Sequence, residues 1–531
     1  MNPNTPGIPS SLESISYYYG LPSKPALVAR SSTELWVEPR GPEAYLTAKE
    51  LKPVGPHALD AIWESVVASA IEAYLTSQEV AFTSVDPARI GYVGSEFFPV
   101  IIWVGVVPGS LSGAKGVEVA VGCRAILTDH GITNVHVEIR SSEAILQAKK
   151  LYKPVRTVNP TAKVIEPLAT TLGLSICGTK TPNLEGTGGF FFTDSKRPGK
   201  LFLLTARHTL FHPDHTDNKH YSLRHPSEKT TKVLLFSDDA FQKHVESIKW
   251  EISTKQILLT QLTRRKRAVE GQDDDEAEED RTEVECLENN AKKAITALQK
   301  LLDEVIHDWT PPANRAIGHV VLSPPLGCSV KPDGYTEDWA VVEINSSRID
   351  KTNFVGNCID LGTSVSVEEF TSWMCPHPTN SPSFKYPGSR LLDFLGFIPD
   401  EQMAKPDNKT LDHDQGSDTM VIKRGSASGL TVGHLNTLRS VVRYYFEGKP
   451  GQSSREVAVY PRNSKSGAFS EPGDSGAAVI DGKGRVAGIL IGGAGTTESF
   501  DCTYVTSINF IIKRLQEHGY EPDIFPTADN L

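Results

Sequence analysis

Three short stretches of this chain carry the residue types of an acyl-transfer site. Ser475 lies between glycines, just before an apolar run of small residues, so a tight turn leaves its hydroxyl and the neighbouring N–H groups facing outward. His208 ends an apolar run that begins at Leu201, and Asp338 opens another one. A serine hydroxyl becomes a strong nucleophile when a base takes its proton and a third group orients that base. The three stretches therefore contain what such a nucleophile needs.

The order and surroundings of these residues resemble those of the chymotrypsin-like (trypsin-like) serine peptidases. The chain has Thr205-Ala-Arg-His208, an aspartate heading a strand at Asp338, and Gly473-Asp-Ser-Gly476. The resemblance covers roughly Ile165 to Leu515. It implies that His208, Asp338 and Ser475 form a catalytic triad, and that the N–H groups of Gly473 and Ser475 form the oxyanion hole.

The same resemblance places a substrate pocket around Phe469, Ser470, Ile491, Gly492 and Gly493. Phe469 stands six residues before Ser475, where trypsin-like members carry an aspartate that attracts Lys or Arg. An apolar floor disfavours a charged side chain and favours apolar burial. We therefore expect cleavage after small to medium apolar residues. A one-residue loop change would bring Ser470 or Glu471 to the floor, and Glu498 is a further carboxylate that could reach the pocket.

Asp474 needs a separate interpretation. In secreted family members the matching aspartate pairs with a new N-terminus that is freed by cleavage. This chain shows no recognisable activation site before the predicted barrels, so it resembles the members that need no such cut.

The predicted fold is multidomain. An N-terminal α/β unit precedes a chymotrypsin-like double β-barrel, which carries an inserted antiparallel coiled-coil hairpin. The alternation at 34–38 predicts a strand of the α/β unit, and the spacing at 58–75 predicts a helix. The predicted boundaries are a flexible arm at 1–31, the α/β domain at 32–160, the first barrel at 161–237 and 311–375, the hairpin at 238–310, an inter-barrel connection at 376–418, and the second barrel with a closing helix at 419–531.

The hairpin is predicted from apolar residues at the a and d positions of a heptad pattern. They are Phe241, Val245, Ile248, Ile252, Leu259, Leu262, Leu287, Ala291, Ala294, Leu298, Leu301 and Val305. The tip at 271–280 contains seven acidic residues and is expected to be solvated. His208 and Asp338 are 130 positions apart, and 57 remain after the 73-residue insertion is removed, which is compatible with neighbouring strands.

Composition limits the remaining possibilities. The net charge of −11 argues against an extended nucleic-acid-binding surface. The seven cysteines are odd in number and scattered, which indicates free thiols in a reducing compartment. The N-terminus lacks the features of a signal peptide, and the longest apolar run, 100–107, is too short to span a bilayer. We therefore expect a cytoplasmic or otherwise intracellular protein that binds neither nucleic acid nor membrane.

His212, His215 and His220 have a spacing that could ligate a metal ion, but no cysteine or second histidine pair supports them. We predict a solvent-exposed loop there, and neither a metal nor a cofactor.

The predicted function is a serine endopeptidase acting on protein or peptide substrates, with a possible protein partner at the hairpin or the N-terminal domain. One alternative is a catalytically silent peptidase-like binding scaffold, which the undamaged triad region disfavours. Another is a non-proteolytic serine hydrolase such as an esterase, because the same triad serves both reactions.

Overall fold

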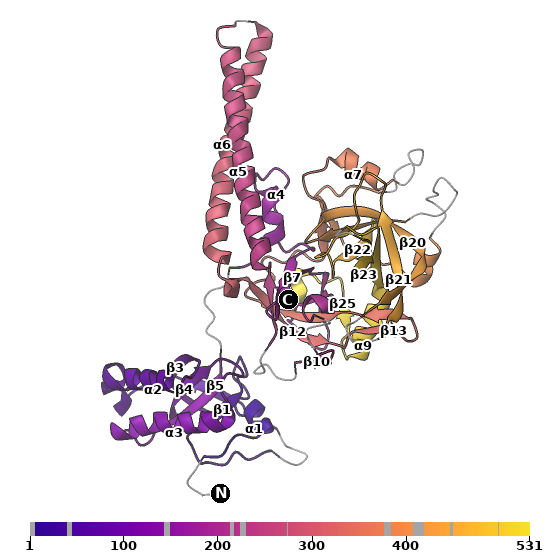
Figure 1. Cartoon of the computed structure of the whole chain (residues 1–531). Helices are drawn as coiled ribbons and strands as arrows, with labels where there is room; N and C mark the ends of the chain where they lie inside the picture. The colour runs from indigo at the N-terminus through magenta and orange to yellow at the C-terminus, as the bar shows by residue number, and fades with distance from the viewer. Residues whose placement is uncertain are drawn as a thin grey trace. The chain divides into compact units, whose positions relative to one another are not determined.

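The chain separates into two compact units. The computed structural model describes residues 6–39, 45–142, 149–212, 217–223, 230–272, 274–375, 384–406, 419–445, 450–496 and 499–531. The N-terminal unit comprises Met1–Leu146 with Leu223–Thr230, and the C-terminal unit comprises Gln147–Ser222 with Thr231–Leu531 (Figure 1).

The described strands of the N-terminal unit form one mixed sheet in the order β1-β5-β4-β3-β2. They are β1 (Leu27–Arg30), β2 (Lys49–Lys52), β3 (Phe82–Tyr92), β4 (Val100–Val106) and β5 (His136–Ser141). β4 and β5 are parallel and are connected through α3 (Gly113–Asp129), whereas the other neighbours are antiparallel. β4 is buried at every residue, because one apolar cluster lies against α2 (Ala68–Ser77) and α3 and a second cluster covers the opposite face of the strand.

Three predictions for this unit differ from the structure. The segment predicted as a flexible arm, 1–31, contains the helix α1 (Ser11–Ser16) and the strand β1, and its residues Tyr18 and Leu21 are buried in one apolar cluster with β4. Residues 32–39 form no strand, and Leu35 is 89% exposed, since alternation alone supplies no partner strand. The predicted helix at 58–75 starts later, at Ala68, after a 3-10 turn (Ala58–Ala61) and a π turn (Trp63–Val67). Ile62 separates the two turns with a non-helical φ of −128°, which interrupts the helix.

The first sheet of the C-terminal unit has the order β25-β8-β9-β15-β12-β11-β6-β7, with β10 beside β12. Its described strands are β6 (Ser175–Gly178), β7 (Thr181–Thr187), β8 (Phe190–Asp194), β9 (Phe202–Thr205), β10 (Tyr221–Ser222), β11 (Lys232–Leu235), β12 (Ala316–Ser323), β15 (Ala340–Ile344) and β25 (Pro522–Asp523). β9 and β15 are antiparallel neighbours, and their pairing sets the position of the site described below.

Two long helices, α5 (Asp238–Ala268) and α6 (Asp275–Trp309), lie side by side between β11 and β12 in the chain (Figure 1). β11 and β12 are antiparallel neighbours, so the chain leaves the sheet and returns to it at adjacent strands. The Ser237 hydroxyl caps α5 and the Asp274 carboxylate caps α6, each accepting from a backbone N–H in the first turn. Of the twelve predicted a and d residues, all but Leu259 and Leu287 are buried.

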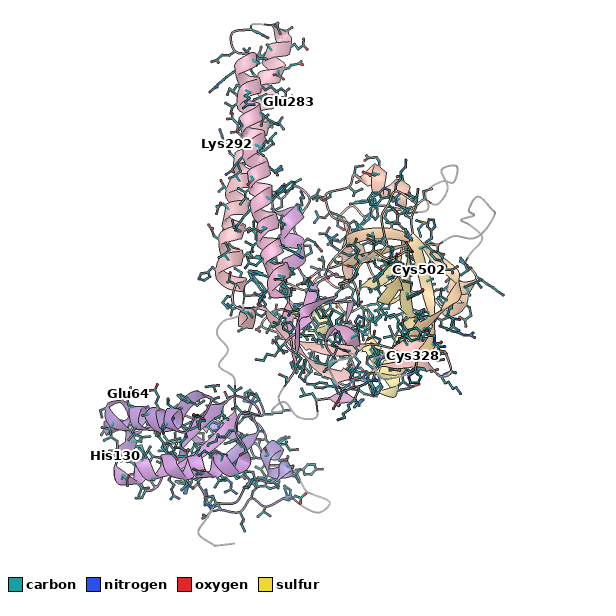
Figure 2. All side chains as sticks on the ribbon, viewed as in Figure 1. Glu64, His130, Glu283, Lys292, Cys328 and Cys502 are labelled. Carbon is teal, nitrogen blue, oxygen red and sulfur yellow. The ribbon has the colours of Figure 1, made fainter. Side chains whose placement is uncertain are left out.

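The two ends of this hairpin are held differently. At the distal end, Arg265 pairs with Asp280 and Glu283, the latter labelled in Figure 2, and both pairs are exposed. At the base, Arg315 donates to the Asp238 carboxylate and to the carbonyls of Trp309 and Thr310. Apolar residues near the base, among them Phe241 and Trp309, belong to the same core cluster as the sheets.

The second sheet has the order β18-β23-β22-β19-β20-β21-β24, and an additional β23–β24 pairing closes a ring from β23 round to β24. Its described strands are β18 (Gly396–Phe397), β19 (Thr419–Gly425), β20 (Gly429–Tyr444), β21 (Gln452–Pro461), β22 (Ala478–Asp481), β23 (Arg485–Ala494) and β24 (Cys502–Ser507). The helix α9 (Ile508–Glu517) follows β24. Two strand pairs stand apart from the sheets, namely β13 (Gly327–Val330) with β14 (Tyr335–Glu337) and β16 (Cys358–Asp360) with β17 (Leu391–Asp393).

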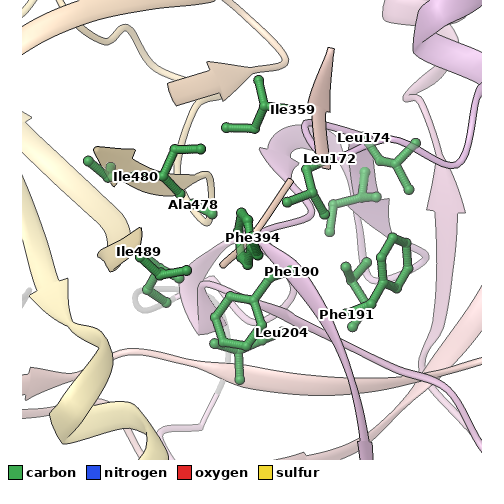
Figure 3. Packing of buried hydrophobic residues seen from close by; sticks show 14 of the residues in the cluster. Leu172, Leu174, Phe190, Phe191, Leu204, Ile359, Phe394, Ala478, Ile480 and Ile489 are labelled. Carbon is green, nitrogen blue, oxygen red and sulfur yellow. The ribbon is translucent and has the colours of Figure 1, made fainter. Parts of the chain in front are cut away.

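The two sheets of the C-terminal unit share one apolar core (Figure 3). Leu204 and Phe190 of the first sheet lie in the same cluster as Ile480 and Ile489 of the second. A shared core fixes the strand ends that border it. Of the helices that the structure describes, none is both long and apolar enough to cross a bilayer.

Candidate active site

The strand register of the first sheet brings His208 and Asp338 to the same place. His208 lies in a 3-10 turn directly after β9, and Asp338 lies between β14 and β15. Ala340 of β15 is paired with Thr205 of β9, so the two polar residues flank one end of the same strand pair. Arg207 anchors the turn, because its buried guanidinium donates to Ser323 Oγ at 2.8 Å.

Asp338 holds the His208 ring through two contacts. His208 Nδ1 lies 2.6 Å from Asp338 Oδ2, and the His208 backbone N–H donates to Asp338 Oδ1 at 3.0 Å. The Asp338 side chain is only 5% exposed, whereas that of His208 is 24% exposed. The arrangement fixes Nδ1 as the protonated nitrogen and leaves Nε2 free to accept a proton.

Burial alone would lower the pKa of His208. The charge of Asp338 and the hydrogen bond from the ring to that carboxylate outweigh burial and raise the pKa of His208 above its ordinary value. A raised pKa makes the neutral ring a stronger base.

Ser475 lies in a turn just before β22 of the second sheet. Its carbonyl accepts from the Thr187 N–H at 2.7 Å, and the Thr205 hydroxyl donates to the Thr187 carbonyl at 2.8 Å. Gly476 has a φ of +96°, and a Cβ on it would lie 2.2 Å from the Thr187 oxygen and 2.5 Å from the Thr205 hydroxyl. The Ser475 turn is thus packed against Thr205, the last residue of β9, which lies three residues before His208. Only glycine fits at position 476 of this turn.

Two backbone N–H groups of this turn have no acceptor among the described residues, those of Gly473 and Ser475. Their neighbours are paired, since the Asp474 N–H donates to the Glu471 carbonyl and the Gly476 N–H donates to the Leu490 carbonyl. Gly473 has a φ of +107°, a left-handed conformation that glycine adopts without strain. Two unpaired donors on one turn can stabilise an oxyanion.

Asp474 is fully buried and forms the support of the turn. Its carboxylate accepts from Lys423 Nζ at 2.8 Å and from Ser428 Oγ at 2.6 Å, and the Glu471 N–H donates to it at 3.0 Å. Lys423 is also fully buried. Burial alone would raise the pKa of Asp474, but the Lys423 charge and these hydrogen bonds lower it below its ordinary value. A Cβ on Gly425 would lie 2.2 Å from Asp474 Oδ1, which explains the glycine two residues after Lys423.

The predicted pocket residues lie in different surroundings. Phe469 is buried in the core, and its ring would contact a Cβ on Gly433. Ser470 is buried too, and its hydroxyl lies 2.6 Å from the Thr503 hydroxyl.

Thr503 is paired with Gly493 across β24 and β23, so Ser470 and Gly493 border the same residue. A Cβ on Gly492, whose φ is +155°, would meet no described atom within 4 Å, whereas Phe500 covers Gly493, with its ring 2.4 Å from where a Cβ would be. Ile491 is buried. Among the described residues, Gly492 is therefore open and Gly493 is covered. Glu498 lies outside the described residues.

Of the histidines that were considered as metal ligands, the structure describes His212 and His220. The His220 ring stacks on the His518 ring with centroids 5.7 Å apart, and His215 lies outside the described residues. Across the part of the chain that the structure describes, no three His, Cys, Asp or Glu side chains are placed to hold a metal ion.

Sequence reasoning missed Lys423, Ser428 and Glu456. The first two hold Asp474, and Glu456 hydrogen-bonds to Thr336, two residues before Asp338. A lysine directly after the apolar run Met420–Ile422, and inside the predicted strand, was the available signal for Lys423.

No protein-family model matches the chain, and no curated protein matches it in sequence. Solved structures that resemble it include proteases. They include a glutamic-acid-specific serine protease (12% identity, 65% of this chain and 97% of that chain, TM-score 0.26). They also include the Rv3671c protease of M. tuberculosis in its active form (11% identity, 71% and 93%, TM-score 0.25). A third is the chymotrypsin of Cellulomonas bogoriensis (18% identity, 38% and 75%, TM-score 0.22).

Proposed function

We propose that the chain is a serine endopeptidase with a chymotrypsin-like double β-barrel, in which the helices α5 and α6 form an inserted coiled-coil hairpin. Ser475 attacks the carbonyl of a peptide bond, and His208 takes its proton. His208 then donates that proton to the leaving amine, and water hydrolyses the acyl-enzyme by the same steps in reverse. Asp338 keeps the ring in the required tautomer, and the N–H groups of Gly473 and Ser475 bind the oxyanion.

The observation that carries this proposal is the 2.6 Å contact between His208 Nδ1 and Asp338 Oδ2 at the end of β9, against which the Ser475 turn packs. Supporting it, the unpaired N–H groups of Gly473 and Ser475 lie on that same turn. Within the described residues the Ser475 hydroxyl has no hydrogen-bond partner. Catalytic hydrogen bonds often form only when substrate is bound.

The position of Lys423 favours a site that is active without an activating cleavage. Its ammonium lies 2.8 Å from Asp474 Oδ2 and supplies a positive charge from within the chain. In our proposal this internal cation fixes the Ser475 turn in its working conformation from the start.

Labelling with a serine-reactive phosphonate tests the proposal. The whole 531-residue chain should be labelled at Ser475. Ser475→Ala or His208→Ala should abolish both labelling and turnover while the fold persists, because these groups stabilise a reaction rather than the core. Ser222→Ala, at a serine outside the turn, is the control and should be labelled normally. Full activity in Ser475→Ala would refute the proposal.

Matched peptide and ester substrates distinguish a peptidase from an esterase, since both reactions pass through the same acyl-enzyme. Turnover of the peptide is expected. Turnover of the ester alone would identify a non-proteolytic hydrolase, and the absence of labelling would identify a binding scaffold.

The surroundings of the pocket residues favour cleavage after small to medium apolar residues, such as Ala, Val, Leu or Met. Ser470 and Thr503 pair their hydroxyls with each other, and Phe469 and Ile491 are apolar and buried. A charged side chain would find no partner among these residues. A peptide library should show this preference, and a profile dominated by Lys or Arg would overturn it.

A further inference from the structure

Glu456 is a buried carboxylate without a cation. It lies on β21 of the second sheet with no measurable exposure. Among the described residues it takes part in no ion pair, and its charge acts on the uncharged side chains of Cys328, Tyr335 and Tyr444. A buried charge of this kind is costly unless hydrogen-bond donors surround it.

Four donors meet this carboxylate. On Oε1 it accepts from the Thr336 N–H at 2.8 Å, the Thr336 hydroxyl at 2.6 Å and the Ser454 hydroxyl at 2.9 Å. On Oε2 it accepts from the Thr506 hydroxyl at 3.0 Å. All three partner residues are buried. Three of these groups lie on Oε1, and the Ser454 hydroxyl also reaches the Gly334 carbonyl at 3.1 Å, so the Thr336 N–H and hydroxyl are the closer donors to that oxygen.

Two of the four donors belong to the segment that carries Asp338. Thr336 lies on β14, in a strand pair that is not part of the second sheet, and Asp338 follows two residues later. Glu456 therefore ties the second sheet to the Asp338 segment. The residue between them, Glu337, is held independently by Arg514 of α9 at 2.8 Å and by the indole N–H of Trp339 at 2.9 Å.

We propose that Glu456 is a positioning residue for the triad, which sets the place of Asp338, and through it the His208 ring, by hydrogen bonds to Thr336. The inference rests on the proposed function. Glu456 does not touch the reacting atoms and acts only through the backbone of residues 336–338. A displacement of about 1 Å in such a segment can lower a catalytic rate on the order of a hundredfold.

Substitutions of Glu456 in the whole chain test this positioning role. Glu456→Ala leaves the Thr336 N–H without its acceptor and should lower kcat by roughly ten- to a hundredfold while KM changes less than about threefold. Glu456→Gln keeps an acceptor for Thr336 and a donor for the Thr506 hydroxyl, so it should restore kcat to within about threefold of the natural protein. Asp481→Asn is the control, because Asp481 is a buried carboxylate whose partners, Lys483 and Arg485, lie next to it in the chain.

A second pair of variants decides the matter if Glu456→Ala does not fold. Thr336→Val and Thr506→Val each remove one buried hydroxyl from the same carboxylate, but only Thr336 is joined to Asp338. Thr336→Val should lower kcat several-fold more than Thr506→Val at a similar loss of stability. Equal effects on kcat would overturn the proposal.

A readout that does not need turnover separates this inference from the proposed function. Proton NMR can follow the Nδ1 proton between His208 and Asp338. Its resonance should shift or broaden in Glu456→Ala and Thr336→Val, and should stay unchanged in Asp481→Asn and Thr506→Val. A folded Glu456→Ala protein with an unchanged resonance and unchanged kcat would refute the positioning role. Absence of activity in the natural protein would refute only the proposed endopeptidase function.

Discussion

Asp474 and Glu456 are two buried carboxylates that stand beside the proposed triad, and their charges are compensated in different ways. Asp474 supports the Ser475 turn and pairs with the ammonium of Lys423. Glu456 supports the Asp338 segment and is met by a backbone N–H and three hydroxyls. The pKa of Asp474 is lowered, whereas burial raises the pKa of Glu456 to about 7, although its hydrogen bonds act in the opposite direction. Hydrogen bonds alone thus offset the burial of Glu456 only in part, whereas hydrogen bonds together with the Lys423 charge more than offset the burial of Asp474.

The two carboxylates therefore link stability to pH with opposite signs. Asp474, with its lowered pKa, contributes stability that is present above its unfolded-state pKa and is lost as the pH falls towards its folded-state value. Glu456, with its raised pKa, contributes stability that is present below about 4.5 and is lost as the pH rises through about 7.

Removing the cation should have the largest effect. Lys423→Met leaves Asp474 buried and unpaired, which typically costs about 3–5 kcal/mol of folding free energy. The Gly473 N–H should also lose its position, and loss of one such donor lowers kcat on the order of a hundredfold or more. Denaturant unfolding and the rate of phosphonate labelling measure the two effects.

A matched control is Lys513→Met, which breaks a half-exposed pair with Asp333 and should cost about 1 kcal/mol or less. Adding Asp474→Asn to Lys423→Met should recover part of the lost stability by removing the unpaired charge. If Lys423→Met is as stable and as reactive as the natural protein, Asp474 does not depend on the Lys423 charge. The proposed difference between the two carboxylates would then be wrong.

Substitution of the second carboxylate, Glu456, should have a smaller effect on the free energy of unfolding, and this effect should depend on pH. A shift of the Glu456 pKa from 4.5 to about 7 corresponds to about 3 kcal/mol of unfolding free energy that is lost between those pH values. Glu456→Gln cannot titrate, so its unfolding free energy should decline less between pH 4.5 and 7.5 than that of the natural protein. Denaturant unfolding at several pH values measures the difference, and parallel curves would show that Glu456 does not titrate in this range.

The distal part of the hairpin, between Leu259 and Asn289, lies away from both carboxylates. Its removal should have the smallest effect on activity. Joining Leu259 to Asn289 through a short Gly-Ser link removes the exposed end of α5 and α6 but keeps the base that packs into the core. Turnover of a short peptide should change less than about twofold, because no side chain near the triad is touched. Joining Ser237 to Pro311 removes Phe241 and Trp309 from the core and should impair folding.

The same pair of truncations tests whether the hairpin is a docking arm. If a protein substrate or partner is lost while the short peptide is still cleaved, the distal hairpin binds it. A large loss of peptide turnover in the distal truncation would contradict the separation of hairpin and site.

Much of the organisation was predictable because the relevant signals are local. His208, Asp338 and Ser475 each adjoin an apolar run, and the heptad spacing from Phe241 to Val305 indicated the helices α5 and α6. The two carboxylates escape such reasoning. Glu456 occupies an alternating position that is typical of a solvent-facing side chain, and its partner Thr336 is 120 residues away. Likewise, Lys423 is 51 residues from Asp474, and only the folded sheet brings them together.

The place of the hairpin in the chain has a consequence for the order of folding. Most strand pairs of the first sheet join segments far apart in sequence, and β25 pairs with β8 across most of the C-terminal unit. The residues of α5 and α6 nearest the short connection, such as Arg265 and Asp280, are close in sequence. Their contacts can therefore form early in folding, and the remaining contacts between the two helices can follow in order towards the base. As they do, they bring the end of β11 to the start of β12. Once the two helices have paired, joining β11 to β12 requires the closure of only a short loop. The long insertion therefore does not slow the pairing of these strands.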